Sequence, residues 1–264
     1  MLDRFCQVLE AVVAAGSPVS AADLSRLTGL PRPTSYRLVA ALSEHGLLDS
    51  VEGDSRYMLG SRFMRMALLG KNDSDLGRSA AVILKRVVAK TGESAFLSRF
   101  RDGSIDLIHV EVPHNSTNGF IHPGLGARPV HACSSAKAIA AYASDEVRDE
   151  LLSGAAERFT DATITRREDV LDELEVTRRR GYALCAEEID EGVVSIAVPV
   201  TIEPVGVMFS LGVVGPARRM TGRKLGELAA TLKLASVRAG TAIQHFEGRL
   251  SESAIEGTEL RASA

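Results

Sequence analysis

The sequence predicts an α+β protein with two domains, a small helix-turn-helix domain followed by a larger domain of helices and antiparallel strands. A length of 264 residues exceeds one minimal module and suits two domains. Helical periodicity dominates the first 46 residues, where two short amphipathic segments meet at a glycine-containing turn. Further along, strand-like segments are grouped between longer helical ones, an order typical of an antiparallel sheet packed against helices.

Composition is that of an ordinary globular protein. Apolar residues make up 45% and charged residues 25% of the chain, which leaves enough apolar side chains for two cores. No leader-like segment opens the sequence, and no stretch approaches the roughly 20 apolar residues of a membrane span. We therefore expect a cytoplasmic protein with no membrane partner. Cys6, Cys133 and Cys185 are far apart and lack CxxC spacing, so we expect reduced thiols and no structural metal site.

Total charge does not predict a nucleic-acid partner. The net charge is −3, and residues 1–66 balance seven arginines against seven acidic residues. The placement of the arginines is more informative than their number. Arg32, Arg37 and Arg56 fall in the segments that the helix-turn-helix pattern would turn toward DNA.

The first two helices follow from local signals. An amphipathic helix is predicted over the first 16 residues, with its apolar residues at the spacing of one helical face. Ser20 then stands at an N-cap position with Asp23 three residues later, which begins a second, short helix. Leu24 and Leu27 are predicted to face the core before Gly29 ends this helix.

A third helix is predicted from Pro33 to Gly46, because proline fits the first helical turn. In a helix-turn-helix this second helix of the motif enters the major groove, with its N-terminal residues on base edges. Arginine can donate two hydrogen bonds to guanine, hydroxyls can donate to bases or phosphates, and a helix N-terminus attracts phosphate. We predict base or phosphate contacts from the residues that begin this helix, together with a phosphate contact from Ser20. The residues are Ser20, Arg32, Thr34, Ser35, Tyr36 and Arg37.

A wing is predicted after the third helix. Leu47–Val51 and Ser55–Leu59 are strand-like and flank Glu52-Gly53-Asp54, a good hairpin turn. Arg56 on the return strand is predicted to reach the DNA backbone. A helical interaction module that never binds DNA is the alternative interpretation of this region.

Three segments of this region together resemble the DNA-binding domain of IclR-family transcription regulators. They are residues 29–38 (Gly-Leu-Pro-Arg-Pro-Thr-Ser-Tyr-Arg-Leu), His45-Gly46-Leu47-Leu48 and Arg56-Tyr57-Met58-Leu59-Gly60. Pro33 departs from the family pattern, which usually has a small polar residue there, and this departure bears on one potential DNA contact. The resemblance implies a protein that binds double-stranded operator DNA.

The remaining two thirds of the chain alternate helices and strands. A linker helix is predicted over Ser61–Gly70, followed by a polar break over Lys71–Asp75. Further helices are predicted at Leu76–Thr91, Ser134–Tyr142, Asp145–Leu152, Arg166–Arg180 and Thr221–Phe246, and strands at Ala95–Phe100, Asp106–Val112, Asn118–Ile121, Gly181–Glu188, Val193–Val200 and Val205–Val213. The expected domains are 1–60 for DNA binding, 61–75 as a linker, 76–247 as a sensor, and 248–264 as a polar, disordered tail.

The family resemblance continues through this region. Four segments are similar to the family's sensor domain in order and spacing, namely Gly126-Ala127-Arg128, His131–Ala138, Gly181-Tyr182 and Glu187-Glu188. The resemblance implies a GAF-like effector-binding domain with an antiparallel sheet flanked by helices. It also implies a homodimer or homotetramer, most often a repressor, controlled by a small-molecule effector and needing no cofactor.

The predicted effector site surrounds the helix that follows His131. Free N–H groups of Cys133, Ser134 and Ser135 at its N-terminus could receive a carboxylate. The family binds its effectors here, and the resemblance implies that the other walls come from Phe120, Ile121, Cys185, Glu187, Ser195, Gly212 and Val214. Cys185 stands where the family can have aspartate, and Gly212 and Val214 stand where it has serine. We therefore expect a less polar pocket that Gly212 makes roomier, for a larger effector such as an aromatic or other organic acid.

Two other classes of function are alternatives for this sequence. A hydrolase or metal enzyme could use His114, His122, His131, Cys133 and Cys185, but HExxH, GxSxG and GxxxxGK motifs are absent and the Cys–His pair has no third orienting group. We therefore expect no catalytic residue and no metal. A metabolite-binding protein without DNA recognition is the other alternative, and Arg32 with Arg37 is the feature that discriminates against it. The sequence names neither the effector nor the operator.

Overall fold

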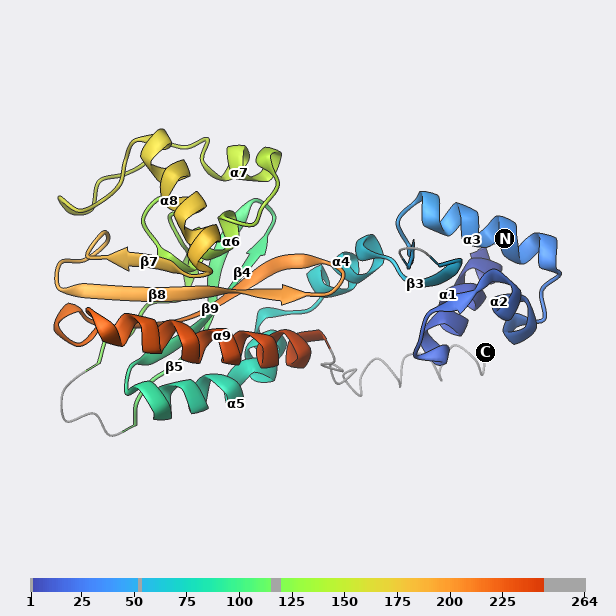
Figure 1. Ribbon diagram of the computed structural model, residues 1–264, viewed down its shortest axis with the longest axis horizontal. Helices are drawn as coiled ribbons and strands as arrows, with labels where there is room; N and C mark the ends of the chain where they lie inside the picture. The colour runs from blue at the N-terminus through green and yellow to red at the C-terminus, as the bar shows by residue number, and fades with distance from the viewer. Residues whose placement is uncertain (1, 52–53, 115–119, 245–264) are drawn as a thin grey trace, which may run out of the picture. The chain divides into compact units, whose positions relative to one another are not determined.

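A computed structural model describes residues 2–51, 54–114 and 120–244 of the chain. Contacts divide the chain into two compact units (Figure 1). The first unit is residues 1–70 with the turn at 203–206, and the second is the rest of the chain from residue 71. The division falls inside the predicted linker 61–75.

The first unit is a winged helix-turn-helix. Its helices are α1 (Leu2–Ala15), α2 (Ala21–Thr28), α3 (Arg32–Glu44) and α4 (Ser61–Leu69), and its strands are β1 (Val19–Ser20), β2 (Leu48–Ser50) and β3 (Arg56–Leu59). The strands form an antiparallel sheet in the order β1-β3-β2, in which Tyr57 pairs with both Val19 and Ser50. Aliphatic side chains from α1, α2 and α3, including Val8, Leu24 and Leu38, pack into one core with Leu48 of the wing.

Local sequence signals explain the helix ends. The Ser20 hydroxyl accepts a hydrogen bond from the Asp23 N–H at 3.1 Å, and the Asp23 carboxylate accepts one from the Ser20 N–H, which is the predicted capping box. Gly29 ends α2 in the left-handed conformation at φ 70°. The α3 helix begins at Arg32, one residue before the predicted start. The prediction that Leu27 faces the core is wrong, because its side chain is 61% exposed.

The second unit is built on a six-stranded sheet in the order β6-β5-β4-β9-β8-β7. The strands are β4 (Ser94–Arg101), β5 (Ser104–Glu111), β6 (Gly126–Ala127), β7 (Ala183–Ala186), β8 (Val193–Ile202) and β9 (Gly206–Pro216). The pairs β6–β5, β5–β4, β4–β9 and β8–β7 are antiparallel. The antiparallel sheet expected from the sequence is thus present.

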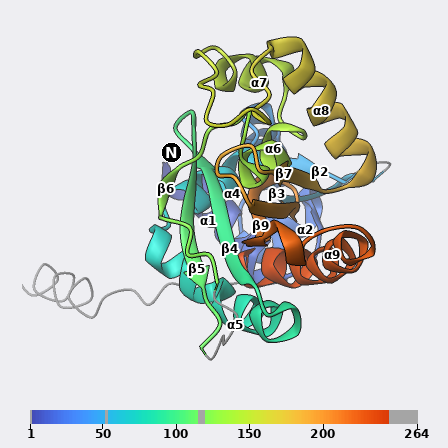
Figure 2. The same cartoon turned by 90° about the vertical axis from the view of Figure 1, so that its left-hand side faces the viewer.

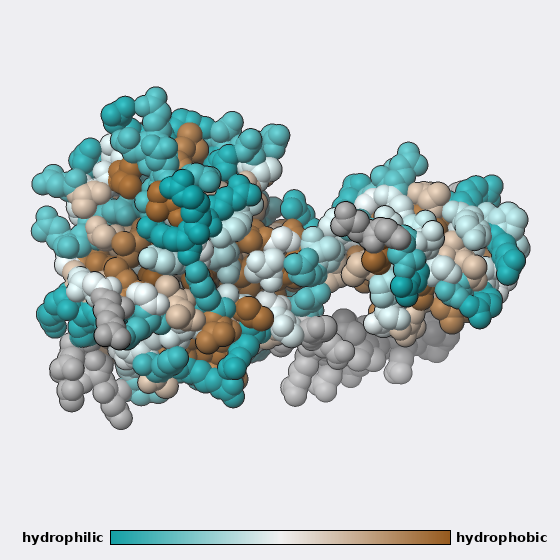
Figure 3. Space-filling view, viewed as in Figure 1, coloured by the Kyte–Doolittle hydropathy of each residue, from teal (hydrophilic) through white to brown (hydrophobic). Residues whose placement is uncertain are grey.

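Helices cover both faces of this sheet, as Figure 2 shows. The helices α5 (Asp73–Thr91) and α9 (Arg223–Gln244) lie on one face, and α6 (Ser134–Ala140), α7 (Asp145–Leu151) and α8 (Arg167–Arg180) lie on the other. A single-turn 3₁₀ helix, η1 (Ala217–Arg219), follows β9. The exposed surface around α8 is mostly hydrophilic in Figure 3, in keeping with its charged sequence. The sheet and one stripe of each long helix therefore supply the core.

Several elements of the second unit differ from the predictions. The α5 helix begins at Asp73, capped by the Asn72 side chain, so the polar break after α4 is shorter than expected. Phe120 and Ile121 are not in a strand, and residues 118–119 of that predicted strand lie outside the described residues. The edge position next to β5 belongs to β6 instead. The predicted tail, 248–264, also lies outside the described residues.

Within the described ranges, no helix is both long enough and apolar enough to span a bilayer.

Candidate functional site

The first turns of α3 present a cationic surface. Arg32, Tyr36 and Arg37 are exposed, and Thr34 is half-buried. Neither Arg32 nor Arg37 forms a hydrogen bond or ion pair with any residue in the part of the chain that the structure describes. Leu38, Val39 and Leu42 hold the opposite side of the helix in the core. The helix thus offers unpaired guanidinium groups at the end that a helix-turn-helix inserts into a groove.

Ser35 does not belong to this surface, and its predicted DNA contact is wrong. The residue is fully buried, and its hydroxyl donates to the carbonyl oxygen of Ala21 at 2.9 Å. This hydrogen bond joins α3 to the start of α2, so the role of Ser35 is to hold the two helices together.

Ser20 acts as a helix cap. Its hydroxyl donates to the Asp23 carboxylate at 2.6 Å, and this hydrogen bond is the first cause of the lowered pKa of Asp23. Its hydroxyl hydrogen is therefore not available to a phosphate, which counts against the predicted contact.

The wing places Arg56 at its surface. Arg56 begins β3, is exposed, and donates from Nε to the Asp54 carboxylate at 2.5 Å. A phosphate would have to compete with Asp54 for this guanidinium.

In the second unit, the start of α6 meets the central strands. The Ser134 and Ser195 hydroxyl oxygens are 2.6 Å apart, which joins the first residue of α6 to β8. The Ser210 hydroxyl on β9 donates to the Ser135 carbonyl oxygen at 2.9 Å. Cys133 is the N-cap, and its Sγ lies 3.2 Å from the Ser135 hydroxyl. The structure thus brings Cys133, Ser134, Ser135 and Ser195 together, but the N–H of Cys133 is not free as expected, because it donates to the Pro129 carbonyl oxygen at 2.9 Å.

An ion pair that the sequence did not predict fixes α6 in this position. The Lys137 Nζ lies 2.7 and 2.6 Å from the two carboxylate oxygens of Glu188. Lys137 is completely buried, so Glu188 balances its charge inside the protein. Burial raises the pKa of Glu188, and Lys137 opposes that rise. The pair ties α6 to the segment after β7.

Cys185 lies on β7 opposite Ser195 of β8 and is buried. Burial, together with the nearby Cys133 and Glu188, raises the pKa of the Cys185 thiol to about 11. A thiol in this environment stays protonated at neutral pH and behaves as a small apolar side chain.

The expectation that Gly212 makes the pocket roomier is wrong. Gly212 pairs with Phe96 across β4 and β9. A Cβ on Gly212 would lie 2.4 Å from the Phe96 ring, so the ring already fills the space that the glycine leaves. The Phe96 ring of β4 therefore occupies the space beside Gly212 of β9 that a side chain would otherwise take.

Apolar side chains and two buried hydroxyls complete this sheet face. Phe96, Leu107 and Val214 form one buried cluster, against which Ile121 packs. Ser94 and Ser98 share a face of β4 with Phe96, since side chains alternate along a strand. Both hydroxyls are buried without a hydrogen-bond partner among the described residues. Unpartnered buried hydroxyls are uncommon, and sequence reasoning missed both of them.

The structure does not place three of the predicted effector residues in this cluster. The Glu187 carboxylate accepts a hydrogen bond from the Gly192 N–H at 2.7 Å, which closes the turn before β8. Phe120 is 41% exposed. His131 points to a different cavity, where its Nε2 donates to the Glu157 carbonyl oxygen at 2.8 Å and its ring stacks on Phe159.

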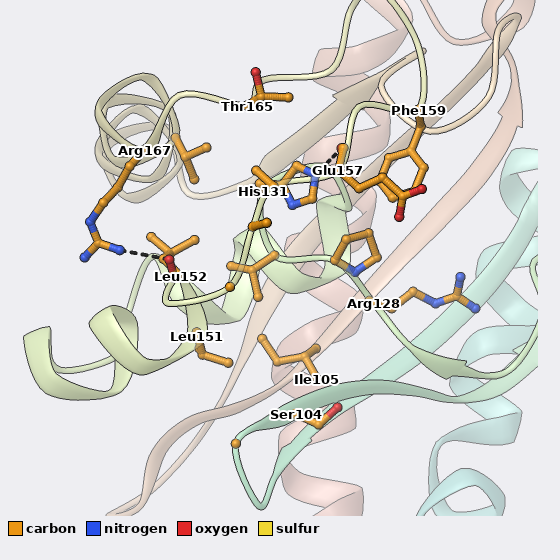
Figure 4. Close-up of a pocket in the computed structure, with 17 residues that line it drawn as sticks. Ser104, Ile105, Arg128, His131, Leu151, Leu152, Glu157, Phe159, Thr165 and Arg167 are labelled. Atoms are coloured by element: carbon orange, nitrogen blue, oxygen red, sulfur yellow. Dashed lines mark hydrogen bonds between the residues drawn. The ribbon is translucent and has the colours of Figure 1, made fainter.

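That cavity, which we call the outer cavity, has a volume of about 340 Å³. It lies between the start of β5, the segment before α6, and the connection from α7 to α8 (Figure 4). Its polar and aromatic lining comprises Ser104, Arg128, His131, Glu157, Phe159, Thr165 and Arg167. Among the described residues, no group of three or more His, Cys, Asp or Glu side chains could hold a metal ion.

Comparison with known proteins gives two family matches that together span most of the chain. Residues 71–239 match the family model "Bacterial transcriptional regulator IclR C-terminal", and residues 1–52 match "IclR helix-turn-helix domain". The chain is 27% identical over 244 residues to the HTH-type transcriptional regulator XynR of Escherichia coli, covering 92% of this chain and 96% of that protein. It is 28% identical over 218 residues to the E. coli regulator KdgR, covering 81% of each.

A solved structure is similar over the same extent. The IclR homolog of Microbacterium hydrocarbonoxydans, complexed with 4-hydroxybenzoate, is 27% identical, with a TM-score of 0.58 over 92% of this chain and 98% of that one.

Proposed function

Because the chain belongs to the IclR family of bacterial transcriptional regulators, we propose that it represses transcription by binding operator DNA through α3 and the wing. A small organic acid held by the second unit controls that binding. The protein acts in the cytoplasm as a homodimer or as a tetramer made of two dimers. Each half-site is contacted by one α3 helix, so a change in the spacing of two DNA-binding units, passed through α4, alters operator affinity.

One observation carries the DNA-binding proposal, namely the exposed, unpaired Arg32 and Arg37 at the start of α3. An arginine that lacks an acidic partner loses no intramolecular ion pair when it binds DNA. Arginine also matches the two acceptors of guanine in the major groove. Tyr36 lies between them in sequence and is equally exposed, so it can contact base or backbone.

The test measures operator affinity by fluorescence anisotropy, on DNA selected from a random pool by the wild-type protein. We expect Arg37→Ala to weaken binding by about 1–3 kcal/mol if Arg37 reads a base. Arg4→Ala removes an exposed arginine of α1 and serves as the matched control, with affinity unchanged. Unchanged affinity in an Arg32→Ala/Arg37→Ala variant would mean that α3 is not the recognition helix.

We place the effector between the start of α6 and the sheet face that carries Phe96. The first N–H groups of a helix lack intrahelical partners and suit a carboxylate. The Ser134 and Ser195 hydroxyls share one hydrogen bond, so one hydroxyl hydrogen of the pair is left to donate to the same group, while Phe96, Leu107 and Val214 suit an apolar body. Ser94 and Ser98 offer two further hydroxyls to a polar substituent. These features favour an aromatic acid, the class to which the 4-hydroxybenzoate bound by the Microbacterium homolog belongs.

Thermal-shift measurements on the full chain test this assignment. We expect stabilisation by hydroxybenzoates and a much smaller effect from glyoxylate, because the small acid leaves the apolar cluster uncovered. Ser195→Val should abolish the shift, because it removes the hydroxyl and puts a bulkier apolar side chain in its place. Stabilisation by glyoxylate-sized acids alone would contradict an apolar effector.

Exposed apolar residues support self-association of the second unit. Val82 on α5 and Leu234 and Val237 on α9 are 59%, 68% and 71% exposed. Exposed apolar residues gathered on neighbouring helices are typical of protein interfaces. Light scattering should show a dimer or tetramer, and Leu234→Glu/Val237→Glu should shift the assembly toward smaller species if this surface is used.

A further inference from the structure

The outer cavity is separate from the effector site proposed above. Of the residues assigned to that site from the sequence, only His131 lines the outer cavity, and it has turned away from the start of α6. We propose that the outer cavity is a second ligand site, for a small aromatic carboxylate.

The shape of one wall points to a flat ligand. The rings of His131 and Phe159 are stacked, with centroids 5.8 Å apart and planes 11° from parallel. Phe159 is 39% exposed, so part of its ring is free to contact a ligand. Ile105 and Val170 add apolar surface to the lining. A ring that packs on such a wall gains both apolar burial and favourable ring contacts.

The charges of the lining favour an anion. Two arginines, Arg128 and Arg167, line the cavity against one carboxylate, that of Glu157. The arginines lie on opposite sides of it in Figure 4. Arg167 is already used, since it donates to the Leu152 carbonyl oxygen at 3.0 Å and to Asp149 at 2.5 Å. A single negative charge suits this balance better than a dianion.

Arg128 is the group that lacks a partner. Its side chain makes no hydrogen bond or ion pair within the described residues, and its Nε is shielded from solvent without an acceptor. Only Nε is shielded, so the two terminal nitrogens of this unpaired guanidinium are the donors available to an anion in the cavity. A carboxylate is the acceptor that matches guanidinium geometry best.

His131 offers a second polar contact. A carbonyl oxygen can only accept, so the Nε2 that faces Glu157 carries hydrogen. In the neutral ring Nδ1 then accepts a hydrogen bond, and no partner for it is found in the described part of the chain. A hydroxyl on the ligand ring would satisfy this atom.

The cavity is held open before any ligand binds. The connection from α7 to α8 is tied to the segment after β7 by two hydroxyls, Thr160 donating to the Glu187 carbonyl oxygen at 2.7 Å and Thr163 to that of Glu188 at 2.6 Å. These hydrogen bonds fix the segment that carries Phe159. A volume of about 340 Å³ is at the small end for ligand pockets and suits a single substituted ring.

The test follows the histidine signals of the full chain by NMR, with benzoate as the probe and His131→Gln to assign the resonance of His131. We expect that resonance to shift saturably at benzoate concentrations below about 20 mM. Arg128→Gln should weaken binding about tenfold, since a hydrogen bond to a charged group is lost. Phe159→Leu should also weaken it. Arg166→Gln, an exposed arginine paired with Glu168 outside the lining, is the matched control and should leave it unchanged.

Ser195→Val separates this site from the proposed effector site. We expect the benzoate titration of His131 to be the same in this variant as in the wild type. The proposal is overturned if the His131 signal does not shift saturably, if Arg128→Gln binds benzoate as tightly as the control does, or if Ser195→Val abolishes the titration. It is also overturned if inorganic phosphate produces the same shift as benzoate, because a ring is then not recognised.

Discussion

Replacing Lys137 by methionine should destabilise the second unit by about 3–5 kcal/mol near pH 8, the usual cost of removing one partner of a buried ion pair. Lys137 is fully buried, and the Glu188 side chain is 8% exposed. Methionine fills most of the space of the lysine stem. It leaves the Glu188 carboxylate without the cation that lies 2.6 Å away in the wild type, so the cost is electrostatic.

The pH dependence of this loss identifies its cause. Burial raises the pKa of Glu188, and Lys137 opposes that rise, so removing Lys137 raises the pKa further. A group with a raised folded-state pKa binds its proton more tightly when folded, and its contribution to stability falls as pH rises through that pKa. The variant should therefore recover stability relative to the wild type as the pH is lowered from 8 toward 5, because Glu188 becomes neutral.

Differential scanning calorimetry of the full chain measures the effect. For a unit of this size each kcal/mol lowers Tm by about 2–4 °C, so we expect a loss of roughly 6–20 °C. Lys137→Met/Glu188→Leu removes both charges and should recover most of it. Arg166→Ala breaks an ion pair whose side chains are 73% and 82% exposed and should cost at most about 0.5 kcal/mol. A loss below about 1 kcal/mol, or an equal loss at pH 5 and pH 8, would refute the argument.

Three further predictions concern packing, the helix-turn-helix and thiol reactivity. Gly212→Ala should lower stability by about 1–3 kcal/mol in calorimetry, because its Cβ would lie 2.4 Å from both a ring carbon and a backbone oxygen. The control is Gly226→Ala on α9, which has open space around it and should stabilise by up to about 1 kcal/mol. A similar response of the two variants would contradict this reasoning. Ser35→Ala should lower the free energy of unfolding of the first unit in urea by about 1 kcal/mol and leave operator affinity unchanged, because its hydroxyl is used inside the fold. Weaker DNA binding without loss of stability would instead support a direct contact between Ser35 and DNA. The Cys185 thiol, with its pKa raised to about 11, should react with Ellman's reagent at pH 8 far more slowly than the exposed Cys6, and comparable rates would show that the site is open.

Signals that act within a few residues were readable from the sequence. The capping box of Ser20 and Asp23 and the left-handed glycines that end α2, α5 and α8 were recognisable because each satisfies backbone groups of its own helix. The two-residue strands β1 and β6 were missed, since alternation cannot be detected over two positions. The long strands were found because apolar residues are concentrated in them.

The burial of Ser35 could have been predicted from spacing. Ser35, Leu38, Val39 and Leu42 follow the i, i+3, i+4, i+7 pattern of one helical face, and that face is the buried one. The hydroxyl of Ser35 suggested a DNA contact by its chemical type, but the position of a residue on the helix decides whether its hydroxyl can reach DNA.

The long-range contacts of the second unit could not be predicted from helical or strand spacing. Lys137 with Glu188 and Phe96 with Gly212 are far apart in sequence, and nothing local to either member announces its partner. The family resemblance indicated which positions surround an effector, but it could not show that the space left by Gly212 is filled from the next strand.

The pairing of β4 with β9 has a consequence for synthesis on the ribosome. Ser94 pairs with Val214 in the register of β4 and β9, so the middle of the sheet joins segments that are translated far apart in time. The core of the helix-turn-helix and the strand pairing of its wing use residues 5–59, so they can form while the rest of the chain is still being made. During that interval β4 and β5 have an open edge, and a nascent chain with an unpaired edge is exposed to chaperones and to aggregation.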